Sequence, residues 1–400
     1  MTTRTPRSAR AALAAGTAAA LTGLAAAALV LLPPPSWTAW QLGLLLVEFS
    51  LLAAVPAAAG LALSLLARRR AAGRSRAAAT AASAANALVL AGALLPAASA
   101  WADARSHGAD LGLGDHLAGL ATTADREPET VVYARPGGTA LELDVWRPRP
   151  GGGPRPVVVN VHGGAEDLPQ SLLPRWDAWL ADRGHVVFDV DYRVAPPGRW
   201  QMPAADLLCA LGWIAEHAPA YGGDPGRIAV MGQSAGGLAV LQAVYTAPGR
   251  IPPSCPAEPV PVRTVVAWYS ITDLASEAVP WRQRHSPIGA ELAAATETMM
   301  GGSPAERPAA YRAASPIRHV RPGLPPTLLI HGGRDMFAPP RDSRALAARL
   351  TAAGVPNRLV EISHAGHMFD LNWGGFASRI ARHAIVGHFA AHLRPPASRP

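Results

Sequence analysis

The sequence contains no lysine, so arginine supplies all 36 of its basic side chains other than histidine, against 28 acidic ones. We attribute this to genomic base composition and draw no chemical conclusion from it. Only two cysteines occur, Cys209 and Cys255, and no histidines accompany them at metal-ligand spacing, which argues against a zinc site. Cys209 lies in the apolar helical run 207–214, so a buried thiol and, in an exported protein, a disulfide both remain open.

The excess of basic charge is confined to one end of the chain. Residues 1–101 hold eight arginines and one acidic residue, whereas the remaining residues hold 28 arginines and 27 acidic residues. A nucleic-acid-binding domain needs its basic side chains on a folded polar surface, and here nearly all the excess lies in an apolar segment. The net charge of +8 therefore gives no support to nucleic-acid binding.

That first segment is almost continuously apolar. Its first long stretch, 11–32, has no charged residue across 22 positions, and as a helix it would measure about 33 Å, enough to cross a bilayer. Helices of a soluble bundle would carry polar faces, and these stretches have none. We therefore predict a membrane region over 1–101 with three transmembrane helices, at about 11–32, 37–67 and 77–100.

Arginines flank these stretches unevenly. Three precede the first stretch and five lie between the second and the third, whereas the connection 33–36 has none. The positive-inside rule then predicts a multi-pass protein of the cell membrane, with a cytoplasmic amino terminus and everything after Trp101 outside the cytoplasm. Glu48 falls in the second predicted span; an intramembrane carboxylate can mark function, but without a basic partner we interpret it as protonated or near an interface. The run 96–100 resembles a cleavage site, so release of a soluble enzyme after Ala100 is an alternative.

The exported part alternates strand-like and helix-like runs. Residues 102–128 are acidic and turn-rich and predict a linker or a piece of a cap, and the alternation over 129–400 predicts a mostly parallel sheet covered on both faces. The interval 274–303 interrupts this rhythm and predicts a lid. The expected strands are 130–134, 140–146, 156–162, 185–193, 227–232, 262–270, 326–332 and 357–363, and the expected helices are 172–181, 203–217, 238–247, 341–353 and 376–393.

Residues 232–237 read GQSAGG, between a predicted strand and a predicted helix. This is the context of a nucleophile elbow, in which a tight turn exposes the serine, here Ser234, at the edge of a sheet. The turn leaves no room for side chains two positions before and after the serine, at Gly232 and Gly236. The N-terminus of the following helix favours the negative charge that develops in acyl transfer. Because a lone G-x-S-x-G is a weak signal, its weight depends on the other motifs.

One such motif is the segment HGGA at 162–165, directly after a predicted strand. Open α/β sheets hold their sites at this edge. Glycines there allow backbone N–H groups to approach a substrate oxygen closely. Gly163, Gly164 and Ala165, together with the N–H of Ala235, would form an oxyanion hole.

Two further motifs supply an acid and a base. Asp335 follows another predicted strand, in HGGRDMFAPP, where it can hold an imidazole in its required tautomer. The segment SHAGHMFD offers two histidines, and we prefer His367 to His364 because it lies deeper in the loop and is followed by an apolar Met-Phe pair. The order Ser, Asp, His is that of the α/β-hydrolase arrangement. His162 and His331 are expected to brace their loops.

With these motifs the sequence resembles the hormone-sensitive-lipase-like and carboxylesterase-type α/β-hydrolases, in particular small microbial esterases with an HGG oxyanion loop. The resemblance covers about 270 residues, by rough count. Two departures matter: Ala165 replaces the third glycine of the family's HGGG, and Glu166-Asp167 replace the usual aromatic residue. The family does not predict the membrane spans. The matching segments are HGGA (162–165), DYRVAP (191–196), MPAAD (202–206), YGGDPGRIAVMGQSAGG (221–237), HGGRDMFAPP (331–340) and GHMFD (366–370).

The resemblance implies Ser234 as nucleophile, His367 as base and Asp335 as its orienting acid. The reaction implied is acyl transfer through a covalent intermediate, with no metal or organic cofactor. We therefore predict a serine hydrolase acting on small-molecule esters of small to medium acyl chains. The alternatives are an amidase or peptidase with the same triad, and a non-catalytic hydrolase-like binding module.

The acyl-binding residues and the oligomeric state stay open at this point. Trp200, Trp281 and the pair Met299-Met300 would line an apolar acyl pocket, although such residues more often pack in a core or a lid.

Overall fold

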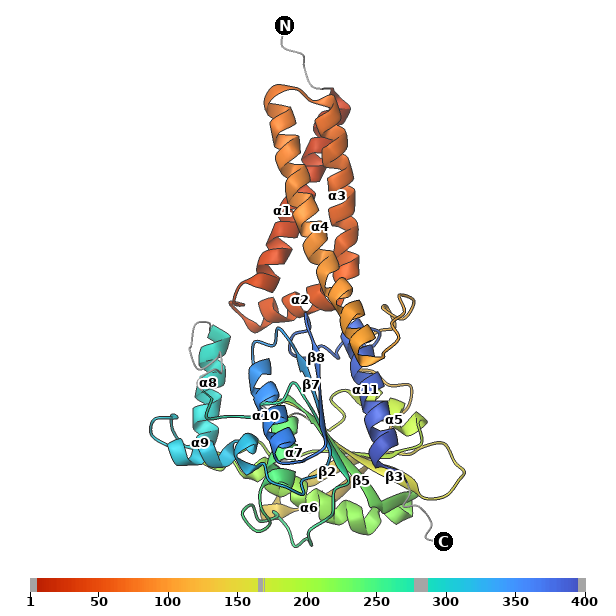
Figure 1. Cartoon of the computed structure of the whole chain (residues 1–400), viewed down its shortest axis with the longest axis vertical. Coiled ribbons are helices and arrows are strands. Elements are labelled where there is room, and N and C mark those ends of the chain that lie inside the picture. Colours follow the sequence, from red (N-terminus) through yellow and green to blue (C-terminus); the bar gives the residue numbers. More distant parts are fainter. Residues whose placement is uncertain (1–5, 165–167, 169, 277–286, 395–400) are drawn as a thin grey trace.

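The computed structural model describes residues 6–164, 168, 170–276 and 287–394. Figure 1 shows a bundle of three long helices that projects from an α/β part, with a short helix lying across the junction. The long helices are α1 (Arg7–Leu31), α3 (Ser50–Arg70) and α4 (Gly73–His107), and the short one is α2 (Trp37–Glu48). Among the described residues, α1, α3 and α4 are the three helices long and apolar enough to cross a membrane.

The second expected span differs from the structure. The stretch 37–67 is two helices, α2 and α3, which meet at the non-helical residue Phe49. Glu48, the last residue of α2, is buried at the junction, where its backbone carbonyl accepts a hydrogen bond from Asn372 Nδ2 (3.2 Å). Burial, and after it the negative charge of Asp370, raise the pKa of Glu48. Where the chain turns at Phe49, other residues of the protein therefore surround this carboxyl group.

Small and polar side chains hold the bundle together. The amide of Asn86 in α4 donates to the backbone oxygen of Gly16 in α1 (2.8 Å) and lies 3.3 Å from Ser64 Oγ in α3. A Cβ added to Gly60 of α3 would lie 2.6 Å from the Cβ of Ala19, so the two helix backbones approach closely. This is the packing expected of helices in lipid, where small residues permit contact and polar side chains bond across the interface.

Helix α4 extends beyond the bundle and joins it to the α/β part. The Asp103 carboxylate accepts from the backbone N–H and the hydroxyl of Ser363 (2.7 and 2.8 Å), and Trp101 packs on Phe376 at 4.9 Å. The predicted cleavage position Ala100 is buried within this continuous helix. The expected linker 102–128 therefore begins as part of α4.

The α/β part contains the mostly parallel sheet expected from the sequence. Its strand order is β1-β2-β4-β3-β5-β6-β7-β8; β2 runs antiparallel to β1 and β4, and the other neighbours are parallel. The strands are β1 (Glu129–Ala134), β2 (Leu141–Trp146), β3 (Arg155–Val161), β4 (Val186–Val190), β5 (Gly223–Gln233), β6 (Thr264–Trp268), β7 (Thr327–Gly332) and β8 (Asn357–Ile362). The helices are α5 (Pro174–Asp182), α6 (Met202–His217), α7 (Ser234–Tyr245), α8 (Pro287–Met300), α9 (Pro308–Ala314), α10 (Pro340–Ala352) and α11 (Phe376–His392), with 3-10 turns η1 (Pro136–Gly138), η2 (Ala218–Tyr221) and η4 (Pro316–His319).

Helices cover both faces of this sheet, which explains the unbroken apolar runs. In β3, Val157, Val159 and Val161 pack in the cluster that includes α6, α7 and α10. Val158, between them, packs in the cluster of α5 and α11. A strand buried on both faces needs apolar residues at successive positions rather than at alternate ones. The predicted α/β-hydrolase fold class is confirmed.

The structure shows how the two cysteines pair, which the sequence left open, and describes part of the predicted lid. Cys209 in α6 forms a disulfide with Cys255, with the Cα atoms 5.3 Å apart. The expected lid, 274–303, contains α8, which stands beside the sheet's carboxyl edge, while its residues 277–286 lie outside the described residues.

Candidate active site

Ser234 lies at the junction of β5 and α7, at the carboxyl edge of the central strands. Its φ is +53°, a left-handed conformation that a non-glycine residue adopts only when the surrounding structure imposes it. Helix α7 begins at Ser234 itself, so the backbone N–H groups of its first turn lie around the hydroxyl. The strained turn is the geometry of a nucleophile elbow.

The glycines around Ser234 are required by close backbone contact. A Cβ on Gly236 would lie 2.2 Å from the carbonyl oxygens of both Val161 and His162, and one on Gly232 would lie 2.7 Å from the backbone of Gly236. No side chain relaxation removes a clash with backbone atoms. The tight turn therefore packs directly against the end of β3, which leads into the 162–165 segment.

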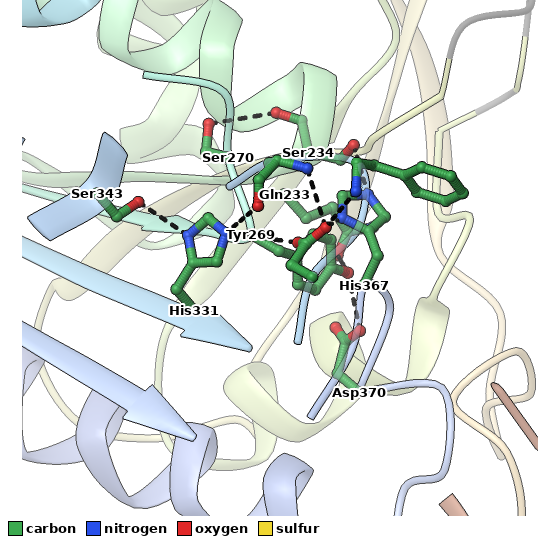
Figure 2. A network of polar contacts seen from close by, with 11 residues as sticks. Gln233, Ser234, Tyr269, Ser270, His331, Ser343, His367 and Asp370 are labelled. Atoms are coloured by element: carbon green, nitrogen blue, oxygen red, sulfur yellow. Dashed lines mark hydrogen bonds and ion pairs between the residues drawn. The ribbon is translucent and has the colours of Figure 1, made fainter. Parts of the chain in front are cut away.

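Three predicted residues from separate parts of the chain meet here. Ser234 Oγ lies 2.9 Å from His367 Nε2, and His367 Nδ1 lies 2.8 Å from Asp335 Oδ2. With Nδ1 protonated, the imidazole donates to the Asp335 carboxylate and accepts from the serine hydroxyl. Figure 2 labels Ser234 and His367. His364, the competing histidine, is not part of this chain of bonds; it lines a neighbouring cavity.

The Asp335 carboxylate is buried and fully committed to hydrogen bonds. Its Oδ1 accepts from the backbone N–H groups of Phe337 and Ala338 (2.8 and 2.9 Å). Burial by itself would raise the pKa of Asp335, but the imidazoles of His367 and His331 outweigh it and hold that pKa below its usual range. Asp335 therefore stays ionised and can stabilise positive charge on His367.

The two other histidines brace loops, as predicted. His331 Nε2 lies 2.9 Å from the carbonyl oxygen of Ala338, to which it donates, and its Nδ1 accepts from the hydroxyl of Ser343 at 2.8 Å. His162 stacks on Tyr192 with the ring centroids 4.8 Å apart. Both side chains thus hold backbone segments on either side of Ser234.

The segment expected to form an oxyanion hole approaches Ser234 closely. A Cβ on Gly163 would lie 2.9 Å from the Cβ of Ser234, and Gly164 has φ +130°, which favours glycine. Ala235 follows Ser234 in the first turn of α7. Ala165 lies outside the described residues. Gly163, Gly164 and Ala235 thus line the same cavity as Ser234.

A second polar network, which the sequence did not reveal, supports the imidazole. Tyr269 packs against His367 at 4.7 Å between ring centroids, and its hydroxyl donates to Asp370 Oδ1 at 2.8 Å. Trp268 Nε1 donates to the other carboxylate oxygen at 3.0 Å (Figure 2 labels Tyr269 and Asp370). Burial, above all, raises the pKa of Asp370. This carboxylate thus orients an aromatic wall and takes no part in the Ser234 chain of bonds.

An apolar cavity of about 580 Å³ adjoins Ser234 and His367. Trp200 and Met299 line it, although the sequence favoured core or lid packing for them, and both also pack in a buried cluster with Met300, which does not line the cavity. Trp281 lies outside the described residues. The size and the lining of the cavity are those of a site for a small apolar ligand.

Helix α2 contributes an unexpected wall of this cavity. Trp37 and Trp40 line it, and both rings pack on Phe337, at 5.7 and 5.0 Å between centroids. Phe337 in turn packs edge-on against His367 at 5.1 Å. A signal for this was present: the 31 residues of 37–67 exceed the length one span requires, and Ser36 after three prolines marks a helix start.

Comparison with known proteins agrees with this architecture. The model of the BD-FAE family matches residues 143–350, just over half of the chain. The chain is similar to esterase LipQ of Mycobacterium tuberculosis, with 30% identity over 269 residues that make up 64% of this chain and 60% of LipQ. It is similar to esterase LipC of the same organism, with 34% identity over 61% of this chain and 60% of LipC. The chain thus spans about 60% of the length of these curated relatives.

A solved structure shares the fold. The esterase Est2 of Thermogutta terrifontis superposes with a TM-score of 0.52 at 24% identity, covering 68% of this chain and 95% of that one. About a third of the chain is therefore unmatched. The N-terminal bundle makes up about a quarter of the whole chain.

Proposed function

This chain belongs to the BD-FAE family of α/β-hydrolase esterases, and from that premise we propose that it is a membrane-bound carboxylic ester hydrolase that uses Ser234, His367 and Asp335. One observation carries the proposal: the unbroken chain of bonds from Ser234 Oγ through His367 to the ionised Asp335, at 2.9 and 2.8 Å. The similarity to LipQ and LipC, both named esterases, supports carboxylic esters as the substrates.

The proposed reaction follows from this arrangement. His367 removes the proton of Ser234 as Oγ attacks the ester carbonyl, and Asp335 stabilises the imidazolium that forms. The backbone N–H groups of Gly163, Gly164 and Ala235 bind the oxyanion, each contributing about 3 kcal/mol. His367 then protonates the leaving alcohol, and water activated by the same imidazole releases the acid.

The size of the cavity supports esters of small to medium acyl chains, because about 580 Å³ also has to admit the reacting carbonyl. An amidase would use the same three groups, and no contact described above favours an amide over an ester. A binding module without turnover would not require the strained φ of +53° at Ser234.

The distribution of arginines supports a membrane location with the catalytic part outside the cytoplasm. Arg7 and Arg10 lie at the start of α1, and three arginines end α3 at Arg68–Arg70. Figure 1 shows these ends of the helices at the tip of the bundle farthest from the sheet. Because arginines stay on the cytoplasmic side, the hydrolase part would lie on the opposite side.

A covalent probe and one variant test the proposal. A fluorophosphonate should label Ser234 of the full-length protein in detergent, and Ser234→Ala should abolish labelling and lower kcat on p-nitrophenyl butyrate by about four to six powers of ten. Labelling of another residue, or a variant within tenfold of the parent, would refute the assignment.

A further inference from the structure

The catalytic cavity adjoins a second cavity that lies beside the membrane bundle. This second cavity also measures about 580 Å³, and Trp40, Phe337 and His367 line both. Its other walls include the last residues of α1, the connection after it, and Leu44 and Val47 of α2. The packed rings of Trp40, Phe337 and His367 therefore lie between the two cavities.

The outer end of this second cavity lies at the level where the chain leaves the membrane. Leu31 and Leu32, at the end of the span α1, line it and are 63% and 62% exposed. Large apolar side chains this exposed at the end of a membrane helix lie against lipid rather than water. The cavity thus opens toward the hydrocarbon edge of the bilayer.

Helix α2 has the properties of a helix that lies in the membrane interface. It crosses the end of the bundle rather than continuing it (Figure 1). Leu42 is 48% exposed on its outer side, while Gly43 and Leu44 are buried on the side that lines the cavity. Tryptophans such as Trp37 and Trp40 concentrate at this depth of a bilayer.

The wall formed by α2 is a fixed part of the site. Besides packing on Phe337, Trp37 donates from Nε1 to Glu291 Oε2 of α8 at 2.8 Å. Helix α8 supplies the facing wall of the catalytic cavity through Leu292 and Met299. The interfacial helix α2, the lid helix α8 and the loop of Asp335 are therefore joined where the two cavities adjoin.

We infer that the substrate is an ester resident in the bilayer, whose acyl group reaches Ser234 while its long apolar alcohol chain extends through the second cavity into the lipid. This rests on the proposed esterase function and names its substrate class. The catalytic cavity would hold the acyl group, and the second cavity, of the same volume, would give room for the alcohol chain beside it. Such a substrate enters without passing through water.

Two butyrate esters test this inference in the full-length protein, reconstituted in vesicles of dialkyl ether phosphatidylcholine that contain no ester of their own. p-Nitrophenyl butyrate reaches the enzyme from water, and hexadecyl butyrate resides in the bilayer. Both form the same acyl-enzyme and release the same butyrate, so they differ in the alcohol and in the route of entry. The soluble ester also normalises for the amount of correctly oriented enzyme.

The native cysteines are bonded to each other, so a cysteine introduced at the opening can be labelled selectively. Leu32→Cys, modified with a charged fluorescent maleimide, should lower hydrolysis of hexadecyl butyrate at least tenfold and change that of p-nitrophenyl butyrate less than twofold. Leu42→Cys is the matched control, because Leu42 in α2 is also exposed but does not line the second cavity. Leu31→Cys is a second labelling position if Leu32→Cys fails to insert.

The outcomes separate the inference from the function on which it rests. Equal rates for labelled Leu32→Cys and labelled Leu42→Cys on hexadecyl butyrate would overturn the entry route. Hydrolysis of the soluble ester alone by the parent protein would overturn the bilayer substrate and leave the esterase standing. Hydrolysis of neither ester would overturn both.

Discussion

Replacing Gly236 by alanine examines the geometry on which the site depends. The added Cβ would lie 2.2 Å from the carbonyl oxygens of Val161 and His162. A carbon and a carbonyl oxygen approach to about 3.3 Å even in their closest favourable contacts, so each overlap is roughly 1 Å. Both oxygens belong to the backbone at the end of β3, so the strand end or the first turn of α7 has to move.

Either movement harms folding and catalysis together. Overpacking of a dense interior costs about 1–3 kcal/mol, and two simultaneous backbone clashes place Gly236→Ala at the upper end. A displacement of about 1 Å between the serine and the oxyanion-binding segment costs about a hundredfold in rate. We therefore expect a lower Tm and a kcat/KM on p-nitrophenyl butyrate reduced at least a hundredfold.

Gly387→Ala in α11 is the matched control. Within the described part of the chain, no atom outside the backbone of the helix itself lies within 4 Å of a Cβ at this position, so the same chemical change meets open space. Alanine in a helix interior is favoured over glycine by about 1 kcal/mol, so Tm should rise slightly and activity should stay the same. If Gly236→Ala retained kcat/KM within threefold and an unchanged Tm, the close packing of the elbow on β3 would be refuted.

Three further perturbations have defined outcomes. Asp335→Asn keeps an acceptor for the N–H groups of Phe337 and Ala338 but turns an N–H₂ group toward His367, which forces the imidazole into the wrong tautomer. We expect kcat to fall by about 10⁴ at an unchanged Tm. A loss of less than tenfold would contradict the role of Asp335. The Cys209→Ser/Cys255→Ser double variant releases a bridge across 46 residues and should lose about 4 kcal/mol of unfolding free energy, measured by denaturation in detergent; an unchanged midpoint would count against it. Burial, and after it His392, lower the pKa of His388 to about 4. The contribution of the neutral imidazole to stability is therefore complete above the ordinary histidine pKa near 6.5 and is lost as the pH falls toward 4. This contribution is at most about 3 kcal/mol. His388→Gln should therefore flatten the decline of Tm between pH 6.5 and 4, and a parallel decline in both proteins would exclude His388 as its source.

Much of the hydrolase part could be predicted because its signals are local. The run PVVVNV of β3 is apolar at successive positions since helices pack on both faces, and that burial is written into the composition of the strand itself. The elbow at Ser234 needs glycines at fixed offsets, which a short motif records completely. The resemblance to esterases, read from such motifs, is confirmed by the BD-FAE match.

The sequence by itself thus determined the order of strands and helices, the residues able to act as nucleophile, acid and base, and the apolar character of the N-terminal hundred residues. Only the tertiary structure decided that 37–67 bends at Phe49, that Cys209 bonds to Cys255, and that α2 walls the catalytic cavity. Hydropathy reports how favourably a residue leaves water, but lipid and protein interior are alike apolar surroundings, so it cannot distinguish Leu44 lining a cavity from Leu42 facing outward. That choice depends on contacts with Phe337 and Glu291, about 300 and 250 positions away, which no local pattern contains.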